Sequence, residues 1–326
     1  MTPATIALVG LGDIALGAHL PALLRNHDVR IAALVDPDAE RRAAAAAAVG
    51  APSCADLSEV DDVDGVVLAT PPWVTTGLVV EAAKAGKFVL AEKPIATSLA
   101  EAKALDALTE GERARVQVGL TYRHDPALEL LREWIVEGRL GDRLLVRAHI
   151  YDERRDESDP AHAARLEETL RHGMPVVHEG AHVFDWFSFL FGGSPSDIRD
   201  GWSLATRNGL AEPNLCGARL DYPQGTVVLA EFGWLTGALP RCEISVLGDR
   251  GHVLVDGRTF DLTLDDGRSV EKVVFEPDRA TRCFDRQLTR FVELMTGVRE
   301  SPSPDLSDGL AALATSERAA AEMSAR

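Results

Sequence analysis

The chain has 326 residues and a formal net charge of −17 at pH 7, with 46% hydrophobic and 26% charged residues. This composition is typical of a globular protein, and the length indicates about two domains. A net negative charge of this size disfavours nucleic acid and anionic membranes as partners. The four cysteines are far apart in the sequence, which indicates reduced thiols and a cytoplasmic protein. The apolar start lacks a basic segment, so we expect neither a signal peptide nor a membrane span.

A glycine-rich turn follows the first predicted strand, residues 5–9. Its sequence, Gly10-Leu11-Gly12-Asp13-Ile14-Ala15, fits the G-x-G-x-x-G/A pattern. Gly10 permits a tight turn, Gly12 lets a pyrophosphate approach the backbone, and Ala15 lets the next helix pack close to the strand. The N–H groups at the start of that helix, which runs to about residue 26, favour phosphate. The turn is therefore predicted to bind a dinucleotide through Gly10, Gly12, Asp13, Ile14 and Ala15.

An acidic residue follows at the spacing that such a turn requires. The second predicted strand, residues 30–35, ends at Asp36. A carboxylate there hydrogen-bonds the hydroxyls of the adenosine ribose and repels a 2′-phosphate, so NAD is favoured over NADP. A second interpretation stays open, in which Asp36-Pro37-Asp38 caps the helix through the alanine run 43–48. Both can hold together.

Strands and helices alternate over the first 120 residues. Further strands are predicted at residues 65–69, 87–91 and 115–119, with helices at 77–85 and 98–109. This alternation predicts an N-terminal Rossmann domain of residues 1–121, whose doubly wound parallel sheet binds ligands beyond the carboxyl ends of its strands. Three segments follow strand ends and should share this edge: Thr70-Pro71-Pro72, Glu92-Lys93-Pro94 and Tyr122-Arg123.

After Tyr122 the pattern changes to that of an α+β domain, residues 122–326. A helix from residue 125 to about 137 precedes eight predicted strands between residues 143 and 275, several of them joined by tight turns. The predicted sheet is largely antiparallel and open on one face, which favours a homodimer or homotetramer. Helices at 278–296 and 305–323 close the chain, and the second is a candidate to pack back on the first domain.

In this order, the motifs resemble the Gfo/Idh/MocA family of NAD(P)-dependent oxidoreductases over essentially the full length. The resemblance rests on Gly10-x-Gly12-x-x-Ala15, Thr70-Pro71, Glu92-Lys93-Pro94, Tyr122-Arg123-x-x-Pro126, Gly138-x-x-Gly141 and Gly180-x-His182-x-x-Asp185. It implies a dehydrogenase or reductase that acts on CH–OH groups of a sugar, sugar derivative or cyclitol. It also adds four cofactor-binding residues: Thr70, Pro71, Glu92 and Lys93.

The resemblance further implies which residues carry the chemistry. Lys93 would contact the reacting hydroxyl, where its charge stabilises the developing alkoxide. His182 would be the general base in oxidation. His178 is assigned to the same site, although the family usually has Asp there, and Thr75 stands where many members have His. The change at His178 leaves the substrate and the pH optimum open. Apart from the resemblance, Lys93 could be an exposed turn residue and the histidines could be packed in a core.

Contacts with a polyol or sugar substrate are predicted for two short segments. Tyr122, Arg123 and His124 lie just past a strand end. Arg154 and Arg155 lie in the charged stretch 152–157, which precedes the histidine pair.

Three other functions stay open. The same fold serves enzymes that recycle bound NAD internally, such as an epimerase or a glycoside-cleaving enzyme, and non-catalytic sensors of NAD and sugar. The segment from His178 to His182 also fits the H-E-x-x-H pattern of zinc peptidases. The extended form of that pattern needs a glycine and a third histidine where the chain has Asp185 and Ser188, so no metal is expected.

Overall fold

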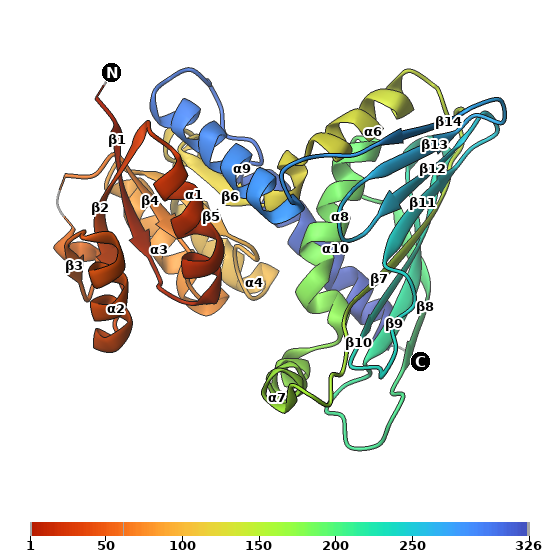
Figure 1. Cartoon of the computed structure of the whole chain (residues 1–326), viewed down its shortest axis with the longest axis horizontal. Coiled ribbons are helices and arrows are strands. Elements are labelled where there is room, and N and C mark those ends of the chain that lie inside the picture. Colours follow the sequence, from red (N-terminus) through yellow and green to blue (C-terminus); the bar gives the residue numbers. More distant parts are fainter. Residues whose placement is uncertain (1, 61, 325–326) are drawn as a thin grey trace. The chain divides into compact units, whose positions relative to one another are not determined.

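The computed structural model describes residues 2–60 and 62–324, which divide into two compact units (Figure 1). Unit 1 comprises Met1–His124 and Ala280–Leu313, and unit 2 comprises Asp125–Arg279 and Ala314–Arg326. The first change of unit lies close to the predicted domain boundary after residue 121. In addition, unit 1 takes a segment from the end of the chain.

Unit 1 is built on a six-stranded parallel sheet with the order β3-β2-β1-β4-β5-β6. The strands are β1 (Ala4–Val9), β2 (Val29–Val35), β3 (Ser53–Cys54), β4 (Gly65–Leu68), β5 (Phe88–Glu92) and β6 (Val116–Gly119). All residues of β4 and β6 are buried, as expected for parallel strands that are covered on both faces. The predicted doubly wound parallel sheet is confirmed.

Both faces of this sheet carry an apolar core. Side chains alternate along β1, so Ile6 and Leu8 belong to one buried cluster and Ala7 and Val9 to the other. Phe291 of α9 packs in the first cluster, and residues of α10 pack in the second. The sequence predicted the last helix as a candidate to pack on the first domain, but it did not predict that α9 packs there. The helical segments of the unit are η1 (Ala15–His19), α1 (Leu20–Arg25), α2 (Ala39–Val49), η2 (Leu57–Glu59), α3 (Pro72–Lys84), α4 (Leu99–Ala102), η3 (Lys103–Ala107), α5 (Glu110–Arg113) and η4 (Thr121–His124).

The helix predicted at residues 98–109 corresponds to α4 and η3, which together span residues 99–107, and a separate helix, α5, follows. Thr109 and Glu112 form a capping box in which each side chain bonds the backbone N–H of the other residue. Such a box starts a new helix, so the chain turns at this point instead of continuing one helix.

Unit 2 is built on an eight-stranded sheet with the order β14-β13-β12-β11-β7-β10-β9-β8. β7 pairs with β10 in parallel, and the other neighbours pair antiparallel, so the predicted largely antiparallel sheet is confirmed. The strands are β7 (Leu145–Glu153), β8 (Asp197–Leu204), β9 (Leu215–Asp221), β10 (Val227–Trp234), β11 (Glu243–Leu247), β12 (His252–Asp256), β13 (Leu262–Asp265) and β14 (Val270–Val273).

Helices α6, α7 and α8 belong entirely to unit 2, whereas α9 and α10 run from one unit into the other. The bounds are α6 (Pro126–Val136), α7 (Pro160–Thr169), η5 (Leu170–His172), α8 (Pro175–Phe191), η6 (Pro223–Gly225), α9 (Arg279–Met295) and α10 (Leu306–Ser324). α7 was not predicted; Asp159 caps it and Pro160 opens it. Within residues 2–60 and 62–324, no helix is long and apolar enough to cross a membrane.

Candidate functional site

The two glycines of the predicted dinucleotide turn have different surroundings. Gly10 has a φ of +83°, and a Cβ added to it would lie 2.6 Å from the carbonyl oxygen of Ala69, just after β4. A Cβ added to Gly12 would meet no atom of the described residues within 4 Å. The protein itself therefore requires glycine at position 10. At position 12 the space is open, as a pyrophosphate that approaches the backbone needs.

The helix after this turn begins as a π-helical segment, η1. Ala15 is fully buried in the core, so the prediction that it lets the helix pack closely agrees with its position. Asp13 and Ile14 lie on the exposed side of the turn. They are therefore accessible to a bound cofactor.

Asp36 is buried at the end of β2 and holds the glycine turn. One carboxylate oxygen accepts a hydrogen bond from the N–H of Leu11 at 2.7 Å, and the other accepts one from Asp38 at 2.8 Å. The cap of α2 is Asp38, which accepts from the N–H groups of Glu40 and Arg41. The segment Asp36-Pro37-Asp38 thus caps α2 through Asp38, as the second interpretation predicted. Each oxygen of Asp36 can accept a further bond, which leaves it available to ribose hydroxyls.

A second loop lies next to the turn, after β4. Thr75 is fully buried, and its hydroxyl lies 2.8 Å from that of Thr70 and bonds the carbonyl of Pro71 at 3.1 Å. Thr75 therefore fixes the loop from within. Beside it, Trp73 keeps 69% of its surface exposed.

Lys93 follows β5 and is half-buried. Its backbone N–H donates to Glu92 Oε2 at 3.2 Å. The other oxygen of this buried glutamate lies 2.8 Å from Nε2 of His19. Lys93 thus begins a segment that is fixed by buried polar contacts inside unit 1.

The segment Tyr122-Arg123-His124 lies in η4, and two of its three side chains are buried. Arg123 pairs with Asp308 of α10 at 2.8 Å. His124 is fully buried with Nδ1 3.1 Å from Arg290, and its pKa lies well below the usual value because of burial first and the charge of Arg290 second. This burial argues against the predicted substrate contacts of Arg123 and His124. Tyr122 is half-buried, and its contact with the substrate stays a prediction.

Both candidate histidines of unit 2 lie on α8. His182 is buried and its ring centroid lies 6.5 Å from that of Trp186. His178 is half-buried; its ring stacks on Trp234 at 5.3 Å, and its Nε2 lies 3.2 Å from the carbonyl oxygen of Gly173. Gly180 lies between them, and an added Cβ would approach Phe184 and Ser316 to below 3 Å. The motif glycine therefore allows close packing of α8.

An acidic group that the sequence did not single out lies beside this pair. Trp234 donates its indole N–H to Asp152 at the end of β7, at 3.1 Å. Desolvation first, and the charges of Glu179 and Glu153 next, raise the pKa of Asp152 to about 7. Part of the surface of Asp152 is exposed to water, which limits this rise in its pKa. The sequence placed Asp152 in a charged loop and gave no signal that it would meet a tryptophan.

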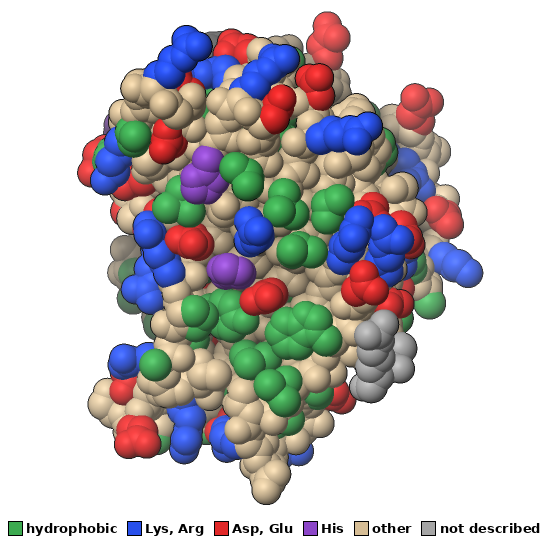
Figure 2. Space-filling view, turned by 90° about the vertical axis from the view of Figure 1, so that its right-hand side faces the viewer, with side chains coloured by type: hydrophobic (Ala, Val, Ile, Leu, Met, Phe, Trp, Pro, Cys, Tyr) green, Lys and Arg blue, Asp and Glu red, His purple; other side chains and the backbone are tan. Residues whose placement is uncertain are grey.

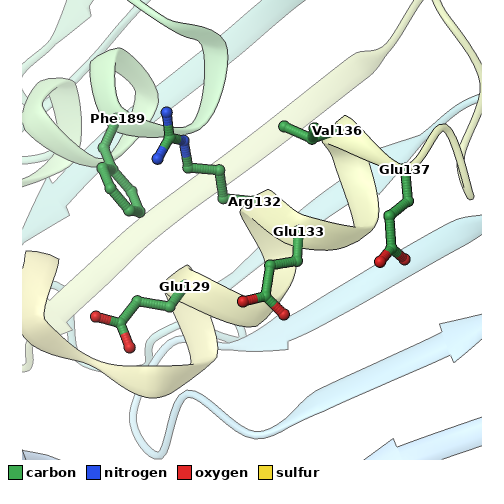
Figure 3. Close-up of a pocket in the computed structure, with 6 residues that line it drawn as sticks. All are labelled: Glu129, Arg132, Glu133, Val136, Glu137 and Phe189. Carbon is green, nitrogen blue, oxygen red and sulfur yellow. The ribbon is translucent and has the colours of Figure 1, made fainter.

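The remaining predicted contacts and a separate pocket lie elsewhere in unit 2. Arg154 and Arg155 are exposed, and Arg154 pairs with Asp156 at 2.9 Å. A pocket of about 580 Å³ lies along α6 and is closed on one side by Phe189 of α8 (Figure 3). It is lined by Glu129, Arg132, Glu133, Val136, Glu137 and Phe189.

The described part of the chain, residues 2–60 and 62–324, contains no group of three His, Cys, Asp or Glu side chains that could hold a metal ion. The zinc-peptidase interpretation needs a third protein ligand beside His178 and His182. Nothing in the described residues supplies that ligand.

Two parts of the sequence match known families. Residues 4–120 match an oxidoreductase family with an NAD-binding Rossmann fold, and residues 128–254 match the GFO/IDH/MocA C-terminal domain. The chain belongs to the Gfo/Idh/MocA family. It is accordingly an oxidoreductase, and its N-terminal Rossmann domain binds NAD.

Several known proteins are similar to this member of the family. Inositol 2-dehydrogenase of Rhizobium meliloti (strain 1021) is 28% identical, over 96% of this chain and 94% of its own. The rhizopine catabolism protein MocA of Rhizobium meliloti is 29% identical, over 77% and 78%. Among solved structures, an oxidoreductase from Agrobacterium radiobacter in complex with NAD⁺, L-tartaric acid and magnesium has the same fold, with a TM-score of 0.83, 18% identity, and coverage of 99% of this chain and 97% of that one.

Proposed function

We propose that this oxidoreductase transfers a hydride between nicotinamide C4 and a secondary alcohol carbon of a sugar, sugar derivative or cyclitol. The observation that carries the proposal is the contrast at the glycine turn, where Gly10 is enclosed by protein and Gly12 faces open space. The name of the similar inositol 2-dehydrogenase supports a polyol-like substrate.

Two residues carry the chemistry in this proposal. In oxidation the hydride leaves the substrate carbon for nicotinamide C4, and the hydroxyl proton passes to the imidazole of His182. The ammonium of Lys93 stabilises the negative charge that develops on the substrate oxygen. Reduction reverses both transfers. His178 orients substrate from the neighbouring turn of α8, held by its stacking on Trp234.

The cofactor preference in this proposal is for NAD over NADP. A 2′-phosphate at the adenosine ribose would bring negative charge to the buried Asp36 carboxylate, whose two oxygens are fixed by backbone N–H groups. Since this carboxylate cannot swing away without losing those bonds, the repulsion would persist.

The test is the rate of NADH formation from NAD⁺ with a panel of polyols, sugars and cyclitols. Lys93→Met and His182→Ala are each expected to lower kcat by about 100-fold or more. The dissociation constant of NADH should stay within a few-fold. Matched controls are Lys84→Met and His172→Ala, which alter exposed residues of the same types. Unchanged kcat in both site variants would contradict the assigned roles.

The same assay separates the alternative functions. Steady accumulation of NADH supports a dehydrogenase, whereas a transient NADH signal during multiple turnovers supports internal recycling, as in an epimerase or glycoside-cleaving enzyme. A sensor would bind NADH and give no NADH signal with any substrate. His178 stands where the family resemblance implies Asp, which is the reason that the assay is designed to distinguish these alternatives.

We also propose that the chain forms a homodimer or homotetramer in the cytoplasm through the open face of the unit 2 sheet. Hydrophobic side chains are interspersed there with charged ones and histidines (Figure 2). Leu229 and Leu247 are exposed by 38% and 42%. Sedimentation velocity should give a dimer or larger species for the wild type and a smaller one for Leu229→Arg/Leu247→Arg. A monomeric wild type would contradict the proposal.

A further inference from the structure

Two buried polar side chains from distant parts of unit 1 form a pair beside Lys93. His19 Nε2 lies 2.8 Å from Glu92 Oε1, and the side chains are exposed by only 5% and 10%. A buried carboxylate is costly unless it is hydrogen-bonded, and His19 supplies a ring nitrogen for that purpose. The mechanism proposed above gives neither residue of this pair a chemical role.

The π-helical start of the phosphate-binding helix places His19 at this position. η1 spans Ala15–His19, and the normal α-helix α1 begins at the next residue. A π-turn adds a residue to the turn and so re-aims the side chain that follows, and such turns are frequent at functional sites. The ring of His19 stands edge-on to Phe284 of α9, with centroids 5.0 Å apart. This contact fixes the ring plane from the other side.

Glu92 is held at both of its oxygens. Oε1 faces His19, and Oε2 accepts the backbone N–H of Lys93 at 3.2 Å. β6 leaves room for this arrangement through Gly119, where an added Cβ would lie 3.1 Å from Oε1. The carboxylate is therefore a bridge from the helix that follows the glycine turn to the backbone of Lys93.

We infer that His19 is a positioning residue, which holds Glu92 and through it the backbone of Lys93 in a fixed relation to the glycine turn. The inference rests on the proposed role of Lys93. The glycine turn and His19 belong to one continuous segment, residues 10–19. The same segment thus binds the dinucleotide and orients the lysine that polarises the substrate oxygen.

The test compares two substitutions of His19 in the full-length, NAD-loaded enzyme. His19→Phe keeps a ring against Phe284 but cannot donate to Glu92. His19→Gln keeps an N–H donor of similar reach. We expect His19→Phe to lower kcat about 10-fold or more, with KM and the dissociation constant of NADH changed less than threefold, and His19→Gln to restore most of kcat. A role confined to stability would not produce this separation of kcat from KM. The exposed His27→Phe is the matched control and should behave as wild type.

Hydrogen exchange provides a second measurement that does not depend on activity. Peptides that contain Glu92 and Lys93 should exchange faster in His19→Phe, because the Lys93 N–H loses its fixed acceptor, and should be protected again in His19→Gln. A wild-type exchange rate of these peptides in His19→Phe would overturn the inference. A wild-type kcat of His19→Phe would also overturn it, provided that Lys93→Met has a lowered kcat. If Lys93→Met retains wild-type kcat, the proposed function has failed and hydrogen exchange alone decides the His19 bridge. Should His19→Phe not fold, His19→Asn, whose amide is too short to reach Glu92, replaces it in both measurements.

Discussion

The two turn glycines permit a prediction that separates folding from cofactor binding. Gly10→Ala places a methyl group 2.6 Å from the carbonyl oxygen of Ala69 at a φ of +83°. The left-handed backbone costs about 1–2 kcal/mol and the contact with a fixed backbone atom about 1–3 kcal/mol, so the free energy of unfolding should fall by about 2–5 kcal/mol.

Gly12→Ala should instead weaken cofactor binding and leave the free energy of unfolding nearly unchanged. Its methyl group meets no described atom of the chain within 4 Å, so the free energy of unfolding should change by less than about 1 kcal/mol. In the proposed cofactor site, the same methyl group would stand where the pyrophosphate approaches the backbone. The dissociation constant of NADH should therefore rise by about 10-fold or more, which is about 1.4 kcal/mol.

Urea unfolding followed by tryptophan fluorescence measures the first quantity, and a fluorescence titration with NADH measures the second. Gly77→Ala on α3 is the control, because it too meets no described atom within 4 Å and lies outside the turn. It should stabilise the chain by about 0.5–1 kcal/mol and leave NADH affinity unchanged. An unchanged NADH dissociation constant in Gly12→Ala would refute the placement of the pyrophosphate.

Three further predictions follow from other residues. Asp36→Asn should reduce the preference for NADH over NADPH about 10-fold in paired titrations, since the amide no longer repels a 2′-phosphate; an unchanged ratio would remove Asp36 from the ribose site. The pKa of His124 is lowered in the folded chain, so below about pH 6.5 the unfolded chain binds a proton at this residue and the folded chain does not. The free energy of unfolding should therefore fall by up to about 1.4 kcal/mol per pH unit of acidification. When urea unfolding is measured between pH 7.5 and 5, the free energy of unfolding should depend less steeply on pH in His124→Gln than in the wild type. An identical pH dependence would contradict the assigned burial. Asn214→Ala removes a bond from the Thr206 N–H at 2.9 Å and one to the Trp234 carbonyl at 2.7 Å, so thermal and urea unfolding should show a loss of about 2–4 kcal/mol, whereas a loss below 1 kcal/mol would speak against this network.

Local sequence patterns were sufficient for the parts of the fold that are set by neighbours in the chain. The glycine turn, the buried strands and the acid after β2 each depend on a few consecutive residues, so their residue types are informative. The Asp36-Pro37-Asp38 segment was ambiguous because its acids could serve a ribose site, the cap of α2, or both. The hydrogen bond from the Leu11 N–H to Asp36, which the sequence does not reveal, separates their roles.

Contacts between distant segments were beyond the sequence patterns. Arg123 looked accessible at the end of a strand because its partner, Asp308, comes almost two hundred residues later. The packing of α9 on unit 1 was missed for a similar reason, since an apolar helix face does not specify what covers it. The π-turn at His19 was missed because a one-residue change in helical register leaves no clear mark on a pattern of period 3.6.

The most direct test of the proposed function is to follow deuterium from [4-²H]NADH, labelled on the transferable face, into the product of a ketone substrate. The account predicts one deuterium on the new carbinol carbon, and a rate of incorporation reduced about 100-fold or more by His182→Ala and by Lys93→Met. Product without deuterium, or incorporation at the wild-type rate in both variants, would contradict hydride transfer by these residues.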